Sequence, residues 1–310
     1  MNLNIQSSPH IRDDVKTKSI MLDVIISLVP SVVWGIVCFG LHSLIVVVVS
    51  VFAAIISETI FNLIVKKENT ISDFSCVVTG MILGLTMPPE IPLYIPIIGS
   101  VFAIVVVKMI FGGLGQNFMN PALAGRCFLA ISFATQMNNY ISNMSVDAFS
   151  SATPLALLKN GQNIDLNAVF CGYIPGTIGE VSTICLLLGA IYLTFKKIID
   201  LRIPLMYIFT FVVFLMLFSN KSINTNYIIG EVIGGGLIFG AFYMATDYTT
   251  SPITPLGKIL YGILLGVLTG IFRLYGKMAE SVSYVILMSN LLVPLINKMT
   301  LPVAFGKEGR

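Results

Sequence analysis

Ten apolar runs, separated by short polar segments, follow one another along the chain. A window of about 20 apolar residues crosses the hydrocarbon layer of a membrane as a helix. The pattern therefore predicts an all-α, polytopic membrane protein with about ten transmembrane helices. The ten runs cover residues 20–39, 44–65, 74–87, 95–111, 121–134, 178–195, 204–218, 227–245, 259–274 and 282–296.

The composition agrees with a membrane protein and excludes several other classes. Of 310 residues, 56% are hydrophobic and 11% are charged, and the mean hydropathy is +0.91. A soluble domain carries about 25% charged residues, so a water-soluble fold of this length could not bury so much apolar surface. The net charge of +3 is small, and the lysines and arginines are scattered along the chain, which argues against a nucleic-acid partner. The five cysteines are widely spaced without a CxxC motif, and we predict no metal site.

Positive charge predicts the orientation of the chain in the membrane. With a cytoplasmic N-terminus, the inner segments receive twelve of the 18 lysines and arginines and the outer segments four, with Lys108 and Arg126 unassigned. This excess predicts that both termini are cytoplasmic and that the polar stretch 136–179 is extracytoplasmic. The inner residues are Arg12, Lys16, Lys18, Lys66, Lys67, Lys196, Lys197, Arg202, Lys258, Lys298, Lys307 and Arg310.

Short or broken runs suggest an internal repeat. The third and fifth runs are too short for a straight span, and Gly80 and Gly84 recur as Gly236 and Gly240 with a shared offset of 156 residues. Five helices per half would give the halves opposite orientations, so we expect two inverted five-helix repeats with broken or short helices. The alternative is that GxxxG serves only helix packing. The expected organisation is a cytoplasmic segment 1–19, a first membrane half 20–135, an extracytoplasmic loop 136–179, a second membrane half 180–297 and a cytoplasmic tail 298–310.

A helix start is predicted within the fifth run. Asn120 is suited to the N-cap and Pro121 to the first helical position, directly after a glycine-rich stretch at 112–115. The exposed amides of a helix start attract phosphate or another anion. A plain structural cap is the simpler interpretation of the same residues.

Several motifs occur in a fixed order and carry a family resemblance. The motifs are Ser8-Pro9-His10, Gly-Leu-Gly-Gln-Asn at 113–117, Asn120-Pro121-Ala122, Gly125-Arg126, Ser-Ser-Ala-Thr-Pro-Leu at 150–155, Pro-Gly-Thr-Ile-Gly-Glu at 175–180, Met-Ala-Thr-Asp at 244–247 and Thr-Ser-Pro at 250–252. Together they closely resemble the membrane flavoproteins that include the D subunit of the Rnf electron-transport complex and the B subunit of the sodium-pumping NADH:quinone reductase. The latter is usually longer at its N-terminus, whereas about nineteen residues precede the first run here, which favours the Rnf subunit.

The resemblance implies a flavin joined to the chain. Members of this family carry FMN through a phosphoester on a threonine in a motif similar to Asp-x-x-[Ser/Thr]-Gly-Ala-Thr, which here implies attachment to Thr153 and hence a phosphoprotein. The sequence departs from the motif at Ser151, where glycine is common. The family also implies a non-covalent riboflavin. The expected cofactor contacts are Asp147, Ser150, Ser151, Ala152, Pro154 and Leu155 around Thr153, together with Asn120 and Arg126.

Acidic residues in or near the apolar runs suggest an ion path. An isolated ionised carboxylate is costly in the membrane and tends to face a cavity, a basic partner or an ion route. Glu58 and Asp247 are the better candidates for a path for Na⁺ or H⁺, with Arg126 and Arg273 as their possible partners or as flavin ligands. Three other acids near run ends are interpreted as reaching the headgroup layer or as lying in the first turn of a helix: Asp23, Glu180 and Glu231.

These observations predict a membrane electron-transfer subunit. The resemblance implies a part of an ion-translocating ferredoxin:NAD oxidoreductase (Rnf) complex that relays electrons through FMN on Thr153, works with the other subunits and is inactive alone. No GxGxxG motif after a strand and no cysteine cluster are present, so sites for NADH or ferredoxin are expected on partner subunits. The alternatives are a B-type subunit of the sodium-pumping reductase, a solute channel or carrier without a redox group, or a purely structural membrane subunit.

Overall fold

The protein is built from α-helices at each of the ten apolar runs. The computed structural model describes residues 16–67, 70–140, 153–159, 162, 164–180, 182–219, 225–276 and 281–302. The main helices are α1 (Thr17–Phe39), α2 (Leu41–Val65), α3 (Ser75–Leu85), α4 (Tyr94–Val101), α5 (Pro121–Ser132), α9 (Thr183–Phe195), α10 (Arg202–Phe218), α11 (Thr225–Ile233), α12 (Leu237–Phe239), α13 (Pro255–Tyr275) and α14 (Val282–Thr300). The shorter helices are η1 (Ile71–Asp73), α6 (Ala134–Met137), α7 (Pro154–Lys159) and α8 (Leu166–Cys171).

The helices differ in whether they can cross a membrane alone. Within the described residues, α1, α2, α13 and α14 are long and apolar enough to span, and the pair formed by Thr225–Ile233 and Leu237–Met244 passes as one span bent by 55°. The third and fifth runs form shorter apolar helices, as expected from their lengths, and so do the fourth, sixth and seventh runs. The protein is therefore a polytopic helical membrane protein that combines full-length spans with short and broken ones.

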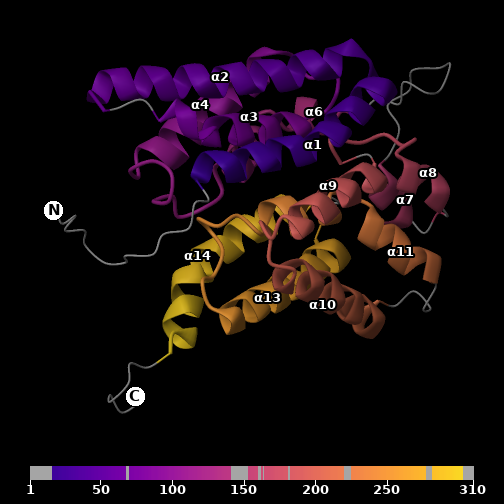
Figure 1. The fold of residues 1–310 in the computed structure, drawn as a ribbon. Helices are drawn as coiled ribbons and strands as arrows, with labels where there is room; N and C mark the ends of the chain where they lie inside the picture. Colours follow the sequence, from indigo (N-terminus) through magenta and orange to yellow (C-terminus); the bar gives the residue numbers. More distant parts are fainter. Residues whose placement is uncertain are drawn as a thin grey trace.

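The chain folds into two packed groups of helices. In the first half α2 packs along α3 and α4, and in the second half α10 packs along α13 (Figure 1). Contacts of α1 with α9 and of α5 with α14 join the halves. Figure 1 shows the start of α1 and the end of α14 at one end of the bundle, with α7 and α8 at the other.

The two glycine pairs of the suspected repeat have different surroundings. A Cβ atom on Gly80 would lie 2.7 Å from Val51 Cα, and one on Gly84 would lie 2.8 Å from Val47 Cα, so this pair allows close contact between α3 and α2. In contrast, Gly236 has a left-handed φ of 68° beside Glu180. The shared offset of 156 residues therefore does not bring shared packing, and the inverted repeat stays a prediction.

Two π-helical segments interrupt the α-helical geometry. The helix α4 continues as η2 (Phe102–Met109), and α12 continues as η3 (Gly240–Met244). Single π-helical turns inside helices often mark functional positions. Each π-helical segment is followed by a polar connection. Residues of both connections line the cavity described below.

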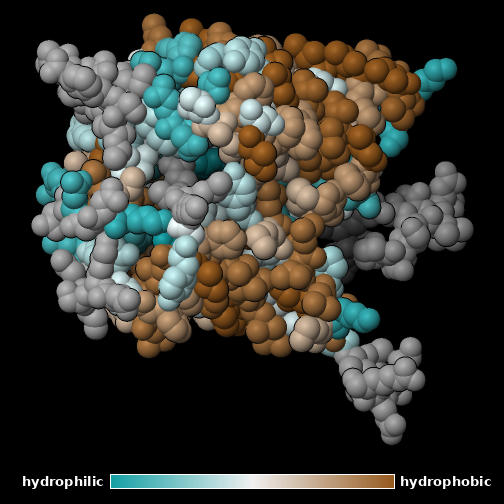
Figure 2. Space-filling view, turned by 180° about the vertical axis from the view of Figure 1, so that it is seen from behind, coloured by the Kyte–Doolittle hydropathy of each residue, from teal (hydrophilic) through white to brown (hydrophobic). Residues whose placement is uncertain are grey.

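The outer surface is apolar along the helices and polar at their ends. On α2 the side chains of Phe52, Ile56 and Ile60 are 59%, 54% and 51% exposed, which suits contact with lipid. Figure 2 shows broad hydrophobic areas over much of one face of the molecule, and hydrophilic residues gathered toward one end.

The predicted start of the sixth span is wrong by several residues. The run was expected to begin at residue 178, but α9 begins at Thr183 after the cap residue Ser182. Instead, the backbone N–H groups of Ile178 and Gly179 donate to the carbonyl oxygens of Met87 and Leu85. These residues are apolar because they pack in a turn against the end of α3, not because they belong to a helix.

Candidate functional site

Thr153 lies at the mouth of a small pocket directly before α7. The carbonyl oxygen of Thr153 accepts a hydrogen bond from Leu157 N, and Pro154 occupies the first position of the helix. The pocket encloses about 310 Å³ and is lined by Thr153, Pro154 and Leu155 together with the turn 174–177, Glu180 and Gly235. Thr177 is 1% exposed, and its Oγ1 has no hydrogen-bond partner among the described residues. We name this hollow the Thr153 pocket.

A buried ion pair forms one wall of the Thr153 pocket. Glu180 Oε1 lies 2.7 Å from Arg126 NH1, and both side chains are at most 10% exposed. The helix α5 supplies the arginine, and the turn before α9 supplies the glutamate. The expectation that Glu180 reaches the headgroup layer is therefore wrong, because its carboxylate is held inside the protein. Arg126 pairs with Glu180, and neither Glu58 nor Asp247 is its partner in this pair.

Another buried ion pair stabilises the helix break beside the Thr153 pocket. Arg273 NH1 lies 3.1 Å from Glu231 Oε2, and NH2 donates to the carbonyl oxygens of Gly234 and Gly235 at 3.2 Å. NH1 also donates to the carbonyl oxygen of Glu231. The last turn of α11 leaves these carbonyls without helical partners, and a guanidinium satisfies several at once. Glu231 is 5% exposed, so it too is an internal residue.

A larger cavity lies between the two halves near the start of α1. It includes about 750 Å³ of open space, counting its mouth, and its walls come from α1, α3, η2, η3, the connection after η2 and the end of α9. Its polar lining includes Lys108, Asn117, Asn120, Asp247 and Thr249. We name it the central cavity. Residues that are far apart in the sequence line this one cavity.

Asn120 has the predicted capping role and also faces the central cavity. Its side-chain oxygen accepts hydrogen bonds from Ala122 N at 3.0 Å and Leu123 N at 3.3 Å, and Pro121 follows at the first helical position. Nearby, Asn117 Nδ2 donates to Thr249 Oγ1, whereas the buried Asn117 Oδ1 has no partner among the described residues. Asn117 therefore belongs to the cavity wall and has a buried amide oxygen without a partner among the described residues.

Asp247 supplies a carboxylate to the central cavity. Its oxygens accept hydrogen bonds from Thr249 N and Thr249 Oγ1 and, at 3.4 Å, from Thr250 Oγ1. Burial raises the pKa of Asp247, and these hydrogen bonds act in the opposite direction. Among the described contacts Asp247 makes no ion pair, so its carboxylate is available to a bound group.

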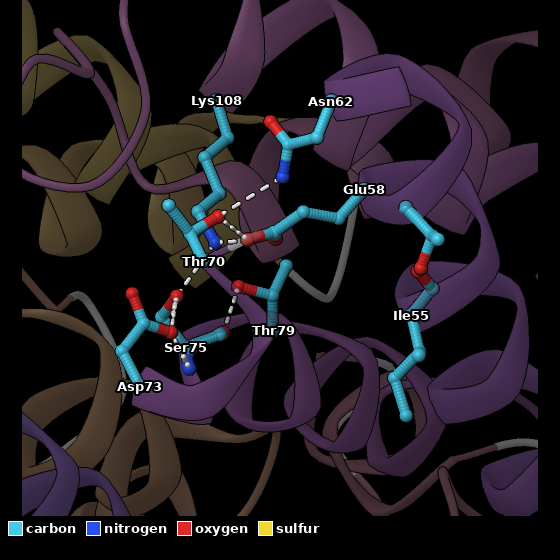
Figure 3. Close-up of polar contacts among 9 residues, drawn as sticks. Ile55, Glu58, Asn62, Thr70, Asp73, Ser75, Thr79 and Lys108 are labelled. Atoms are coloured by element: carbon cyan, nitrogen blue, oxygen red, sulfur yellow. Dashed lines mark hydrogen bonds and ion pairs between the residues drawn. The ribbon is translucent and has the colours of Figure 1, made fainter. Parts of the chain in front are cut away.

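Glu58 lies in a buried polar cluster on the first half. Figure 3 shows its carboxylate facing Lys108 and Thr70, with Lys108 also directed at Ser75. Lys108 Nζ lies 2.7 Å from Glu58 Oε2, and the two side chains are 2% and 0% exposed. Ser75 and Lys108 also line the central cavity. The partner of Glu58 is thus Lys108, a residue to which the charge distribution assigns no side of the membrane.

The structure brings the predicted residues into two groups. Thr153, Pro154 and Leu155 line the Thr153 pocket, and Arg126 reaches it through Glu180. Asn120 and Asp247 line the central cavity, and Glu58 contacts it through Lys108. The remaining motif residues lie outside the described residues: Asp147, Ser150, Ser151 and Ala152.

Sequence reasoning missed several polar residues of these sites. Lys108 had a usable signal, because a lysine inside an apolar run is expected to face a partner or cavity. Thr177 and Asn117 had no comparable signal, since single threonine and asparagine residues in polar connections are common.

Comparison with known proteins extends over nearly the whole chain. A family model described as the NQR2, RnfD, RnfE family matches residues 4–306. The chain is 42% identical, over 99% of its length and 96% of the relative, to the D subunit of the Na(+)-translocating ferredoxin:NAD(+) oxidoreductase complex of Acetobacterium woodii. It is 40% identical, over 97% and 96%, to the D subunit of the proton-translocating ferredoxin:NAD(+) oxidoreductase complex of Clostridium ljungdahlii. It is 31% identical, over 99% of both chains, to the D subunit of the ion-translocating oxidoreductase complex of Actinobacillus succinogenes.

Proposed function

Because this chain belongs to the NQR2, RnfD, RnfE family, we propose that it is the D subunit of an ion-translocating ferredoxin:NAD oxidoreductase (Rnf) complex. In this role it is a membrane electron-transfer subunit that works with the other subunits of the complex and is not active alone. The match to relatives named as D subunits over nearly the full length of both chains supports this choice. A B-type subunit of the sodium-pumping NADH:quinone reductase is the alternative within the family.

The proposed redox group of the Thr153 pocket is FMN, attached through its phosphate to Thr153 Oγ1. The observation that carries this proposal is the position of Thr153 at the mouth of a pocket whose buried Thr177 hydroxyl lacks a partner among the described residues. A phosphate on Thr153 offers acceptor oxygens to that hydroxyl. When bound, FMN can link one-electron and two-electron carriers.

The protein's own residues position this group. Pro154 and Leu155 fix the start of α7 beside Thr153, and both are buried. The Arg126–Glu180 pair holds the facing wall, and Arg273 holds the carbonyl groups of the adjacent helix break. The attachment threonine therefore borders a pocket in which Glu180, another lining residue, is held by a buried ion pair.

We assign the non-covalent riboflavin of this family to the central cavity. Ligand sites of this kind combine apolar walls with a few placed polar groups. The cavity has apolar walls from α1, α3 and η3, and its polar lining includes Asn117, Asn120, Asp247 and Thr249. Extraction of the purified protein with acid should release one unphosphorylated flavin per chain, and Asn117→Leu should reduce that amount.

The proposal includes a contribution to the translocation of Na⁺ or H⁺. The similar relatives are named for Na⁺ in one case and for protons in the other, and the chain is 42% and 40% identical to them. Glu58 and Asp247 are the proposed acidic residues of the route. Their replacement by Gln and Asn should lower ion transport while the flavins stay bound. Unchanged ion transport with normal electron flow in both variants would show that these residues have only a structural role.

The decisive experiment concerns the hydroxyl of Thr153. The mass of the intact chain should exceed the sequence mass by one FMN phosphoester, and Thr153→Ala should abolish flavin fluorescence on a denaturing gel. Thr153→Ser keeps an oxygen and should be modified in part, while Ser150→Ala is the matched control that keeps the acceptor. Peptide mapping of residues 147–159 locates the group. FMN on Ser150 or Ser151, or covalent flavin that persists in Thr153→Ala, contradicts this assignment.

A further inference from the structure

A buried lysine–glutamate pair separates the central cavity from the surface at the end of α2. Lys108 and Glu58 are 2% and 0% exposed, and their charged atoms lie 2.7 Å apart. Isolated ions are costly at such a depth, and a buried pair remains strained by desolvation even when its geometry is good. Moving the proton from Lys108 Nζ to Glu58 Oε2 would replace two buried charges by two neutral groups. Such a transfer would keep the proton within the 2.7 Å contact between the two side chains.

The outer end of the pair is joined to the surface. Thr70 is exposed in the connection between α2 and η1, and its hydroxyl donates to Glu58 Oε1 (Figure 3). Asn62 Nδ2 donates to the same hydroxyl at 3.2 Å. This connection follows Lys66 and Lys67, which the charge distribution places on the cytoplasmic side. A hydroxyl that accepts and donates can pass a proton from water to the glutamate.

The inner end of the pair opens on the central cavity. Lys108 Nζ donates to Ser75 Oγ at 2.6 Å, and both residues belong to the cavity wall. An ammonium has three donors, and the described contacts account for two of them. A third N–H is thus available beside the cavity. The hydrogen-bonded series from surface to cavity is Thr70, Glu58, Lys108.

The same contacts disfavour a sodium ion at Glu58. Thr70 donates to one carboxylate oxygen and Lys108 donates to the other. A sodium ion would have to displace the ammonium and leave it buried without its partner, which costs several kcal/mol. The site is therefore built for protons.

We propose that Glu58 and Lys108 form a proton relay from the surface at Thr70 to the redox group of the central cavity. This inference rests on the proposed riboflavin in that cavity. A flavin bound in the cavity would take up a proton when an electron from the partner subunits reduces it, and Lys108 would supply that proton from Nζ. A proton from water then reaches Glu58 by way of the Thr70 hydroxyl and passes to Lys108, so the pair returns to its first state.

Other titratable groups lie near the pair. Asp73 accepts hydrogen bonds from Ser75 N and Ser75 Oγ, and Cys76 on α3 adjoins the same cluster. The cavity lining also includes the acidic residue Asp247. Asp73 contacts Ser75 and is not a member of the hydrogen-bonded series, so Asp73→Asn should slow proton uptake less than changes at the pair.

The experiment measures proton uptake in the purified chain, away from the redox groups of partner subunits. A Thr153→Ala background removes the proposed covalent FMN, so the flavin that remains is the one proposed for the central cavity. A light pulse with a photoreductant reduces this flavin, and a pH-indicator dye follows the proton. Glu58→Gln, Lys108→Met and Lys108→Arg should each slow uptake by about 10²-fold or more. The matched control is Thr59→Val on the next residue of α2, whose hydroxyl bonds only Ile55 O in the described contacts, and its rate should stay unchanged.

Lys108→Arg separates a relay from a structural or electrostatic role. An arginine keeps the positive charge and the pair with Glu58, but its guanidinium does not release a proton. Wild-type uptake in Lys108→Arg, loss of the cavity flavin from that variant, or wild-type uptake in Glu58→Gln would each overturn the relay. The double variant Glu58→Gln/Lys108→Met should be no slower than its slower parent, because the two residues act in series. Absence of any flavin in the Thr153→Ala background would instead refute the proposed riboflavin site.

Discussion

Arg273 should contribute more to stability than the Glu231 with which it forms an ion pair. Its guanidinium contacts one carboxylate and the carbonyl oxygens of Glu231, Gly234 and Gly235, and it lies 5.1 Å from the centre of the Phe211 ring. Arg273→Met leaves a buried carboxylate and several carbonyls without this donor, which costs about 3–5 kcal/mol or more. Glu231→Gln removes one acceptor and leaves the carbonyls to hold the arginine, so we expect a loss below about 2 kcal/mol.

Thermal unfolding in detergent measures this asymmetry. At roughly 2–4 °C per kcal/mol for a chain of this order of size, Arg273→Met should lower the apparent Tm by about 6–20 °C and Glu231→Gln by less than about 8 °C. The double variant should recover only the part caused by the stranded carboxylate. Equal losses in the two single variants, or full recovery in the double variant, would show that Arg273 serves only the ion pair and does not cap the helix break.

Three further predictions concern packing, pH and topology. Gly80→Val should lower stability by about 1–3 kcal/mol in the same melting assay, because a Cβ would lie 2.7 Å from the Val51 backbone, and an unchanged Tm would contradict close α2–α3 packing. Although burial opposes it, hydrogen bonds from Arg202 N and Lys258 hold the pKa of Asp200 below its ordinary value. The stabilisation by Asp200, about 0.2–1 kcal/mol, is therefore present above pH ~4 and lost as the pH falls through the lowered pKa, so Asp200→Asn should flatten the decline of Tm with acid. Cysteines placed at Lys66 and Lys197 should react with a membrane-impermeant reagent from the cytoplasmic side, and one at Tyr173 from the other; labelling of all three from one side would refute the proposed orientation.

The helical architecture could be predicted because apolar spacing carries it directly. Each of the ten runs coincides with a helix or a broken pair, and the cap at Asn120 follows from local hydrogen-bond chemistry. The start of α9 could not be predicted in the same way. Ile178 is apolar in a turn that packs against the end of α3, and hydropathy does not distinguish a buried turn from the start of a span.

The partners of the buried charges required the fold. Glu58 and Lys108 are 50 residues apart, and Arg126 and Glu180 are 54 apart. The rule that membrane charges seek partners identifies the residues but not the pairing, since pairing depends on how helices pack. For this reason the sequence suggests Arg126 and Arg273 as partners of Glu58 and Asp247, whereas the structure pairs them with Glu180 and Glu231.

Thr153 is a different case, because an ordered set of motifs pointed to it and no local physical rule did. Without the other motifs, a threonine directly before Pro154 would be interpreted as a helix cap. The structure adds the pocket, the buried Thr177 hydroxyl and the Arg126–Glu180 wall, none of which has a pattern in the sequence. These additions make the attachment proposal testable at the level of single side chains.

The buried cations do not strengthen the suspected repeat. Lys108 near the end of the fourth run contacts Ser75 at the start of α3, and Arg273 near the end of the ninth run contacts Glu231 in α11. Ser75 and Glu231 share the 156-residue offset of Gly80 and Gly236, but Lys108 and Arg273 are 165 residues apart. The two cations also have different surroundings, because Lys108 pairs with Glu58 beside the central cavity, whereas Arg273 holds the carbonyl groups of the helix break beside the Thr153 pocket. Their contacts are therefore explained by local packing in each half, and the repeat stays a prediction.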